Sequence, residues 1–282
     1  MPIHRSRRFA FWLTWAAVLL AGWACVSTSA FAQSETGIGD VRDSAAGSDI
    51  STASDETPAR RRARIRLELA GAYFGRGQLS TALDEVKQAI TLDGNYSEAY
   101  EMRGLIYDAL NEPRFAEESF RRALQINSRN GSAAHNLAWF LCRRQDYARA
   151  DEFFQRAADF PGTIALSKTL MARGVCQLQA GSLGNAEKYL ARSHELDPSN
   201  PAVSFNMALV LYRMKEYERA RFYARRVNNI SERASAASLW LGARIEHKLN
   251  NLAGRDELAI QLRNRFGSSR EVTALELGRF DE

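Results

Sequence analysis

Side chains that could carry acid–base or metal chemistry are few in this sequence and lie far apart. Outside the N-terminal segment the histidines are His135, His194 and His247, and none has a second His or Cys at metal-site spacing. The chain contains no G-x-S-x-G motif, no H-E-x-x-H motif and no glycine-rich phosphate loop. Carboxylate pairs such as Glu117 and Glu118 fall on an expected solvated helix face. The sequence therefore predicts a non-enzymatic protein with no cofactor, no metal site and no small-molecule substrate.

The cysteines offer a different chemistry, because a thiol can be acylated or oxidised. Of the three cysteines, Cys25 lies near the N-terminus, whereas Cys142 and Cys176 lie 34 residues apart in the main body of the chain. A disulfide between the latter two would stabilise the fold by roughly 3–4 kcal/mol in a chain-entropy estimate. The alternative is a pair of buried free thiols that pack as small apolar side chains. An oxidising compartment favours the disulfide.

The first 32 residues have the organisation of a secretory signal peptide. Basic residues precede an apolar run over residues 9–25, and small residues follow it. Cleavage after Ala32, at an A-x-A sequence, would release a soluble chain. Cleavage before Cys25 would instead leave a cysteine for lipid attachment. The apolar run is barely long enough for a transmembrane anchor, which needs about 20 residues, so we expect export.

Composition sets two further limits. Residues 33–58 consist mainly of Ser, Thr, Ala, Gly and Asp with no aromatic residue, and such a segment is expected to be a disordered linker. The net charge is +5, and three arginines before residue 33 contribute +3 of it, which leaves +5 − 3 = +2 for the rest. This near-neutral charge argues against a nucleic-acid partner.

A pattern of small residues repeats along the rest of the chain. Alanines recur at spacings of 34, 34, 36 and 34 residues, at Ala82, Ala116, Ala150, Ala186 and Ala220. A second small residue precedes each of them by twelve positions, at Ala70, Gly104, Ala138, Gly174 and Ala208. A period of about 34 residues is typical of the tetratricopeptide repeat (TPR), in which two antiparallel helices, A and B, cross closely. Larger side chains at the crossing would separate axes that pack about 8–10 Å apart.

The repeat predicts an all-α fold, a TPR superhelical solenoid of about six helix-turn-helix repeats. The expected TPR domain covers residues 59–282, with units at 63–96, 97–130, 131–164, 167–200, 201–234 and 235–268. Residues 269–282 are expected to form a capping helix, since a solenoid must cover its last apolar face. Turn residues separate helix A from helix B in three units, at Gly77, Asn111 and Gly181.

The A helices are expected to line a concave groove that holds another protein. Positions 5, 9 and 12 of each A helix usually face this groove, and here they are mostly apolar or aromatic. The residues expected to contact a partner are Phe74, Leu105, His135, Trp139, Leu178, Phe205 and Tyr212. The alternative for each is packing between neighbouring A helices. Cys142 and Cys176 lie on successive A helices, so their thiols could face each other.

Several longer strings resemble one family of repeat proteins. They are RIRLELAGAYF at 64–74, RGLIY at 103–107, AEESFRRAL at 116–124, NLAWFLC at 136–142, RGVC at 173–176, ASLWLGAR at 237–244 and QLRNRF at 261–266. Over roughly residues 60–280 the chain resembles the type IV pilus biogenesis and stability family (PilF/PilW). The resemblance implies a periplasmic protein with six TPR units, associated with the inner face of the outer membrane. The pair Cys142 and Cys176 resembles the inter-repeat pair of some members.

The resemblance also implies a partner and a role. A pilotin of this family helps the pilus secretin to reach the outer membrane and to form its ring, and the partner would be held in the concave groove. Lipid attachment at Cys25 would provide an outer-membrane anchor, although Gly22 and Trp23 depart from the usual lipoprotein pattern. The alternative is another cell-envelope TPR adaptor, in peptidoglycan synthesis or outer-membrane assembly.

Overall fold

The computed structural model describes residues 56–162 and 164–281. The described residues belong to the unit Ser51–Glu282. The expected signal peptide, the Cys25 thiol and nearly all of the expected linker therefore lie outside the described residues.

The described residues form α-helices and one short 3-10 helix, and no strand occurs among them. The A helices are α1 (Pro58–Gly75), α3 (Ser97–Ala109), α5 (Gly131–Arg143), α7 (Leu166–Gln179), α9 (Pro201–Arg213) and α11 (Ala236–Lys248). The B helices are α2 (Leu79–Leu92), α4 (Pro113–Ile126), α6 (Tyr147–Asp159), α8 (Leu183–Leu196), α10 (Tyr217–Asn228) and α12 (Leu252–Phe266). The 3-10 helix η1 (Ser231–Arg233) precedes α11, and α13 (Arg270–Glu276) follows α12.

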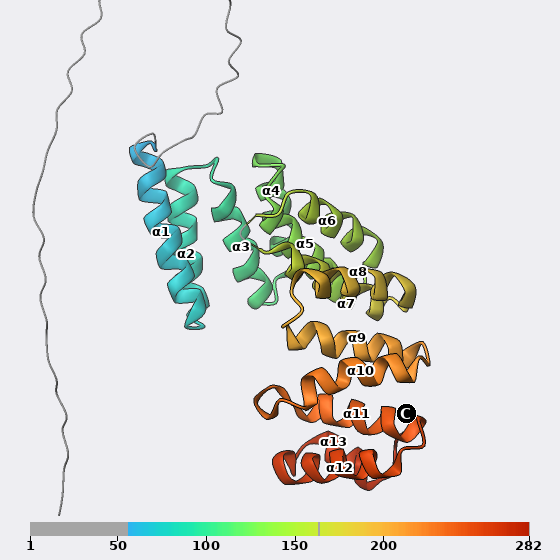
Figure 1. Ribbon diagram of the computed structural model, residues 1–282. Coiled ribbons are helices and arrows are strands. Elements are labelled where there is room, and N and C mark those ends of the chain that lie inside the picture. The colour runs from blue at the N-terminus through green and yellow to red at the C-terminus, as the bar shows by residue number, and fades with distance from the viewer. Residues whose placement is uncertain (1–55, 163, 282) are drawn as a thin grey trace, which may run out of the picture. The chain divides into compact units, whose positions relative to one another are not determined.

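Consecutive helix pairs stack on one another (Figure 1). Each A helix packs against its own B helix and against the A helix of the next unit, and each B helix from α2 to α10 also contacts the following A helix. The A helices therefore form a continuous layer along the stack of helix pairs. The prediction of an all-α TPR solenoid is confirmed.

Close helix crossings explain the recurring small residues. A Cβ atom built on Gly104 would lie 2.6 Å from the ring of Phe120 on the paired B helix. A Cβ atom on Gly174 would lie 2.6 Å from Cγ of Leu190, again on the paired B helix. Ala138, at the equivalent place in α5, is fully buried. The pattern seen in the sequence is therefore a packing requirement at each crossing.

The turn between helices A and B adopts the left-handed conformation in every unit. The expected turn residues Gly77, Asn111 and Gly181 have φ values of 73°, 58° and 78°. Gln145, Lys215 and Asn250 occupy the same turn in the other three units, with φ values of 64°, 64° and 57°. An L side chain is strained in this region. Neither Gln nor Lys is a residue type that indicates such a turn, so these two positions were not predictable from the sequence.

The first helix begins five residues before the expected start of the first unit at residue 63. Its N-cap is Thr57, whose side chain accepts a hydrogen bond from the backbone N–H of Arg60 at 3.1 Å. Pro58 occupies the first turn, where its missing N–H has no cost. The guanidinium of Arg60 pairs with Asp93 at 2.5 Å and lies over the ring of Tyr96. These contacts tie the extended start of α1 to the connection between α2 and α3.

The last helix covers the end of the stack. Helix α13 starts at the N-cap Ser269, whose hydroxyl accepts from the N–H of Val272 at 3.3 Å. It contacts α11 and α12, and Leu275 is buried in one cluster with Leu239 and Leu262. Helix α13 thus lies within residues 269–282, where a capping helix was expected.

Candidate peptide-binding surface on the A helices

The A-helix layer presents the side chains that the repeat register assigned to a groove. Five of the expected contact residues are partly buried and pack against the core clusters of their units. They are Phe74, Leu105, Trp139, Phe205 and Tyr212. Each thus combines packing between helices with some exposed surface. Leu178 differs, because only 4% of it is exposed and it belongs to the core rather than to an accessible surface.

His135 forms a polar contact between two neighbouring A helices. Its Nδ1 lies 3.1 Å from the hydroxyl of Thr169 on α7, and its ring meets the ring of Phe154 edge-on at 5.8 Å. Burial lowers the pKa of His135 to about 4. The imidazole is therefore neutral near pH 7, and it adds an uncharged polar group to the A-helix layer.

Glu101 is the other polar side chain at the same position of the repeat, one unit earlier. Its carboxylate accepts hydrogen bonds from the side-chain amides of Asn136 at 2.8 Å and Asn130 at 3.3 Å. Burial raises the pKa of Glu101 to about 7, and the nearby charge of Glu98 acts in the same direction. The register placed Glu101 on the groove side, but it did not reveal this shifted pKa.

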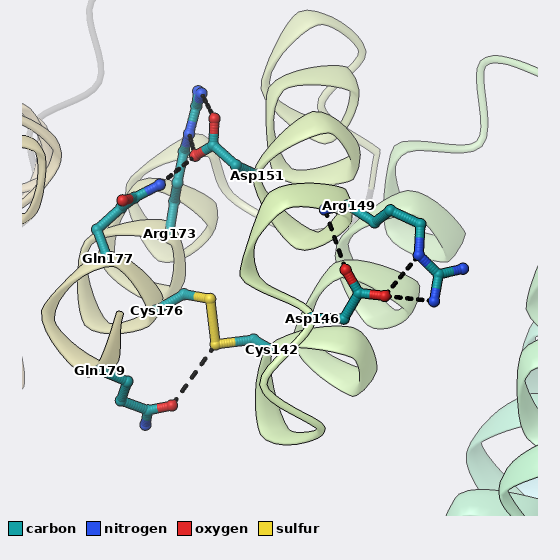
Figure 2. Close-up of a disulfide and its surroundings, with 8 residues drawn as sticks. All are labelled: Cys142, Asp146, Arg149, Asp151, Arg173, Cys176, Gln177 and Gln179. Atoms are coloured by element: carbon teal, nitrogen blue, oxygen red, sulfur yellow. Dashed lines mark hydrogen bonds and ion pairs between the residues drawn. A yellow bond between two sulfur atoms is a disulfide. The ribbon is translucent and has the colours of Figure 1, made fainter. Parts of the chain in front are cut away.

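Cys142 and Cys176 form a disulfide that joins α5 to α7 (Figure 2). Their Cα atoms are 5.8 Å apart, and both residues are buried. Oε1 of Gln179 lies 3.6 Å from Sγ of Cys142. A disulfide sulfur has no proton to donate, so this approach is a packing contact. The disulfide links the third and fourth units within the A-helix layer.

A buried arginine joins the same two units beside the disulfide (Figure 2). Two guanidinium nitrogens of Arg173 on α7 donate to the two carboxylate oxygens of Asp151 on α6, each at 2.7 Å. A third donates to Gln155 at 2.6 Å, and Gln177 also donates to Asp151. The guanidinium lies 4.0 Å from the ring centroid of Tyr189. The hydrogen bond from Arg173 lowers the pKa of Asp151, so this carboxylate stays charged and paired.

The described residues offer no site for metal chemistry. Within residues 56–162 and 164–281, no three His, Cys, Asp or Glu side chains are grouped so that they could hold a metal ion. None of the helices in this part of the chain has both the length and the apolar character needed to cross a bilayer. The A-helix layer combines aromatic and polar side chains, a mixture that can hold a peptide segment.

The register did not identify the contacts made by the residues that follow α13. The hydroxyl of Tyr212 donates to the backbone oxygen of Phe280 at 3.4 Å, and Arg244 donates to the same oxygen at 3.2 Å. Tyr212 is an expected groove residue, so part of the A-helix layer is occupied by the chain itself. A contact between residues 68 positions apart leaves no trace in a 34-residue repeat pattern.

Comparison with known proteins relates this surface to a biological system. A family model described as tetratricopeptide repeat matches residues 97–130. The type IV pilus assembly protein PilF of Pseudomonas aeruginosa is 27% identical over 157 residues, which are 56% of this chain and 62% of that protein. The crystal structure of PilW, a "widely conserved type IV pilus biogenesis factor", is 28% identical and superposes with a TM-score of 0.69. That superposition covers 76% of this chain and 97% of PilW.

The chain is a homologue of the PilF/PilW type IV pilus biogenesis TPR proteins. A structure of Pseudomonas aeruginosa PilF also matches, with 24% identity and a TM-score of 0.70 over 79% of this chain and 100% of PilF. At that identity the match shows the shared fold. The sequence match to PilF spans less than two thirds of PilF. The PilF/PilW homologue therefore has a TPR fold that is suited to protein–protein interaction.

Proposed function

We propose that this protein is a non-enzymatic periplasmic scaffold for type IV pilus biogenesis. It acts as a pilotin, which promotes outer-membrane targeting and multimerisation of the pilus secretin. The observation that carries the proposal is the similarity to PilW, which extends over 97% of that chain at 28% identity. A likeness over nearly the whole of a pilus biogenesis factor supports a shared role better than a match to one repeat would.

The chemistry of the A-helix layer supports capture of a protein segment. The expected contact residues contribute aromatic and aliphatic surface, with Trp139 near the middle of the stack. Aromatic side chains in partly buried positions tend to dominate interface energy. Two polar residues of the layer, Glu101 and His135, are largely engaged with neighbouring helices. Binding would therefore depend mainly on apolar contacts with an extended or amphipathic segment of the secretin.

The proposed location is the periplasm, at the inner face of the outer membrane. The support is the signal-peptide pattern of residues 1–32 together with Cys25 as a candidate lipidation site. Labelling with a palmitate analogue, in the wild type and in a Cys25→Ser variant, distinguishes a lipid anchor from cleavage after Ala32. Several acyl groups would hold the protein firmly at the membrane, whereas a single chain would hold it only marginally.

Gene deletion tests the proposed role directly. In a strain that makes type IV pili, we expect deletion to reduce detergent-resistant secretin multimers and to abolish twitching motility. Complementation with Trp139→Ala should restore both only partly, with about tenfold weaker secretin binding and an unchanged helical circular dichroism signal. The matched control is Phe222→Ala, an aromatic residue on the B helix α10 that is 58% exposed.

The result of the deletion decides between functions. Unchanged secretin multimers together with unchanged motility would contradict the pilotin role and would favour another envelope adaptor. Equal rescue by Trp139→Ala and by Phe222→Ala would contradict the assignment of the binding surface to the A helices. Reduced rescue by both variants to the same extent would also contradict that assignment.

A further inference from the structure

The residues that follow α13 return to the A-helix layer. We name residues 277–281 the tail segment. The backbone oxygen of Phe280 accepts hydrogen bonds from Tyr212 on α9 and from Arg244 on α11. Side chains from two successive A helices thus hold one peptide carbonyl. The tail segment itself is a turn, in which the N–H of Phe280 donates to the backbone oxygen of Gly278 at 2.9 Å.

The side chain of Phe280 occupies a mixed aromatic and basic site. Its ring stacks on the imidazole of His247 with centroids 4.7 Å apart, and it lies 5.1 Å from the ring of Trp240. The guanidinium of Arg255 lies 5.4 Å from the centroid of the same ring. Stacking and cation–π contacts of this kind are favourable beyond the apolar area that they bury. The site therefore recognises an aromatic side chain through several independent contacts.

The residue after Phe280 adds a charge contact. The carboxylate of Asp281 pairs with the ammonium of Lys248 on α11. Together with Arg244 and Arg255, this lysine gives the site three basic side chains around one aromatic residue and one acidic residue. Charge complementarity fixes which segment fits and in which direction it runs. The site thus matches an aromatic residue followed by an acidic one.

The tail segment does more than close the end of the stack. Helix α13 already covers the last apolar face through contacts with α11 and α12, where Leu275 is buried. Phe280 lies beyond that helix and reaches α9, one unit further back. Nδ1 of His247, in the wall of the site, is buried and has no hydrogen-bond partner among the described residues. The site therefore retains a polar atom that the tail segment does not satisfy.

We propose that α9 and α11 form a second peptide-binding site, specific for segments in which an acidic residue follows an aromatic one, and that the tail segment is its intramolecular occupant. A partner that carries such a sequence displaces the tail segment and takes over its contacts with Tyr212, Trp240, Arg244, His247 and Lys248. The inference does not require the secretin to be the partner. It goes beyond the proposed function, because it assigns a ligand chemistry to the end of the A-helix layer formed by α9 and α11, where Tyr212 is the one residue shared with the expected groove.

Tethering explains why the site is closed in the free protein. A segment joined by a few residues acts at an effective concentration on the order of millimolar. A free peptide with similar contacts must compete with that concentration. Removing the ring of Phe280 removes the competitor's contacts with His247, Trp240 and Arg255 and keeps every residue in the walls of the site. We call a variant in which the tail segment is released from the site an opened chain. An opened chain should bind a peptide that the wild type binds poorly.

The test uses the full chain and a fluorescein-labelled peptide with the sequence LGRFDE, which is that of residues 277–282. Fluorescence polarisation should give at least tenfold tighter binding to Phe280→Ala than to the wild type. Adding Trp240→Ala to Phe280→Ala should weaken that binding at least tenfold. The peptide LGRADE should bind none of the chains. Ile260→Ala is the matched control, because Ile260 lies on α12 outside the tail segment and is 56% exposed. This variant should bind the peptide as the wild type does.

A second opened chain keeps the test decisive if Phe280→Ala loses helical signal. Asp281→Lys places like charges beside Lys248, and the side chain of Asp281 is 72% exposed, so folding should be unaffected. Equal binding by wild type and both opened chains would overturn the inference, as would no binding to either opened chain. If the wild type were a dimer that Phe280→Ala dissociates, the tail segment would bind a second copy of the chain, and the inference of an intramolecular occupant would be wrong. None of these results involves the secretin, so they are independent of the pilotin role.

Discussion

Glu101 and His135 are polar side chains in a largely apolar layer, and burial moves their pKa values in opposite directions. Burial raises the pKa of Glu101 to about 7 and lowers the pKa of His135 to about 4, so the fold favours the neutral form of each. The repeat register could place both residues on the A helices. It could not provide their pKa values, because these depend mainly on how deeply each side chain is buried in the folded stack.

Replacing Glu101 with Gln should alter how stability depends on pH. In the unfolded chain the carboxyl group ionises with an ordinary pKa of 4.5, whereas in the fold its pKa is about 7. Its stabilising contribution is therefore complete below pH 4.5 and is lost as the pH rises towards 7. We expect the free energy of unfolding of Glu101→Gln, relative to wild type, to rise by about 2 kcal/mol between pH 5 and pH 8.

Urea denaturation at the two pH values measures this difference. Comparison with wild type cancels the opposite contribution of His135, whose neutral form is stabilising above pH 6.5 and less so as the pH falls towards 4. Glu118→Gln, an exposed carboxylate on α4, controls for the loss of one negative charge. A difference between Glu101→Gln and wild type that is the same at pH 5 and pH 8 would contradict the raised pKa.

At the scale of the helices, the small residues at crossings were predictable and the turns were only partly so. Gly104 and Gly174 recur in phase, and the structure places bulky side chains directly against them. The turn residues Gln145 and Lys215 share the left-handed conformation of Gly77, but their residue types carry no local preference for it. The unit imposes that conformation on them through the packing of helix A against helix B, and tertiary packing of this kind is not visible in one sequence.

Two glycines on paired helices should respond oppositely to replacement by alanine. In Gly174→Ala the new Cβ would lie 2.6 Å from Cγ of Leu190 and 3.2 Å from the backbone oxygen of Ala186, so α7 and α8 must move apart. Overpacking of this kind costs about 1–3 kcal/mol, partly offset by about 1 kcal/mol of helix propensity. Gly184→Ala in the first turn of α8 meets no atom within 4 Å and should gain up to about 0.5 kcal/mol, less than at a mid-helix position.

Thermal unfolding monitored by circular dichroism compares these two variants with the wild type. Gly174→Ala should unfold at a lower temperature and Gly184→Ala at a higher one. A shift of both variants in the same direction would contradict the close crossing of α7 and α8, because helix propensity alone stabilises both.

At the scale of the whole described unit, the sequence predicted the features that recur in every repeat. It did not predict the contacts that occur at one place only. The six-unit solenoid follows from a pattern that recurs every 34 residues or so, whereas the resemblance to PilF/PilW rests on particular sequence strings within the units. The return of Phe280 to Tyr212 occurs once, so no period indicates it. The pairing of Arg173 with Asp151 also occurs at one boundary. Contacts that distinguish one boundary between units from the others can be identified only in the folded structure, because they depend on distances between side chains.

The disulfide between the third and fourth units should determine how the solenoid unfolds. In a solenoid each unit contacts only its neighbours, so stability is a sum of unit and boundary terms. Closing a loop of 34 residues contributes about 3–4 kcal/mol in the chain-entropy model. We expect Cys142→Ala combined with Cys176→Ala to lose about that amount. Wild type in reductant should lose a similar amount, and reductant should leave the double variant unchanged.

Hydrogen exchange should show where this loss occurs. Exchange should rise most in α5 to α8, which lie on both sides of the boundary, and least in α1, α2 and α12, because the effect of one boundary decays along a linear array. The Arg173–Asp151 pair remains at the boundary, so the two parts should loosen without separating completely. Alkylation before and after reduction measures the bond itself: equal masses would mean that the thiols are free in solution. A uniform rise in exchange across all helices would contradict unit-by-unit coupling, because the loss of one link would then have weakened the whole stack at once.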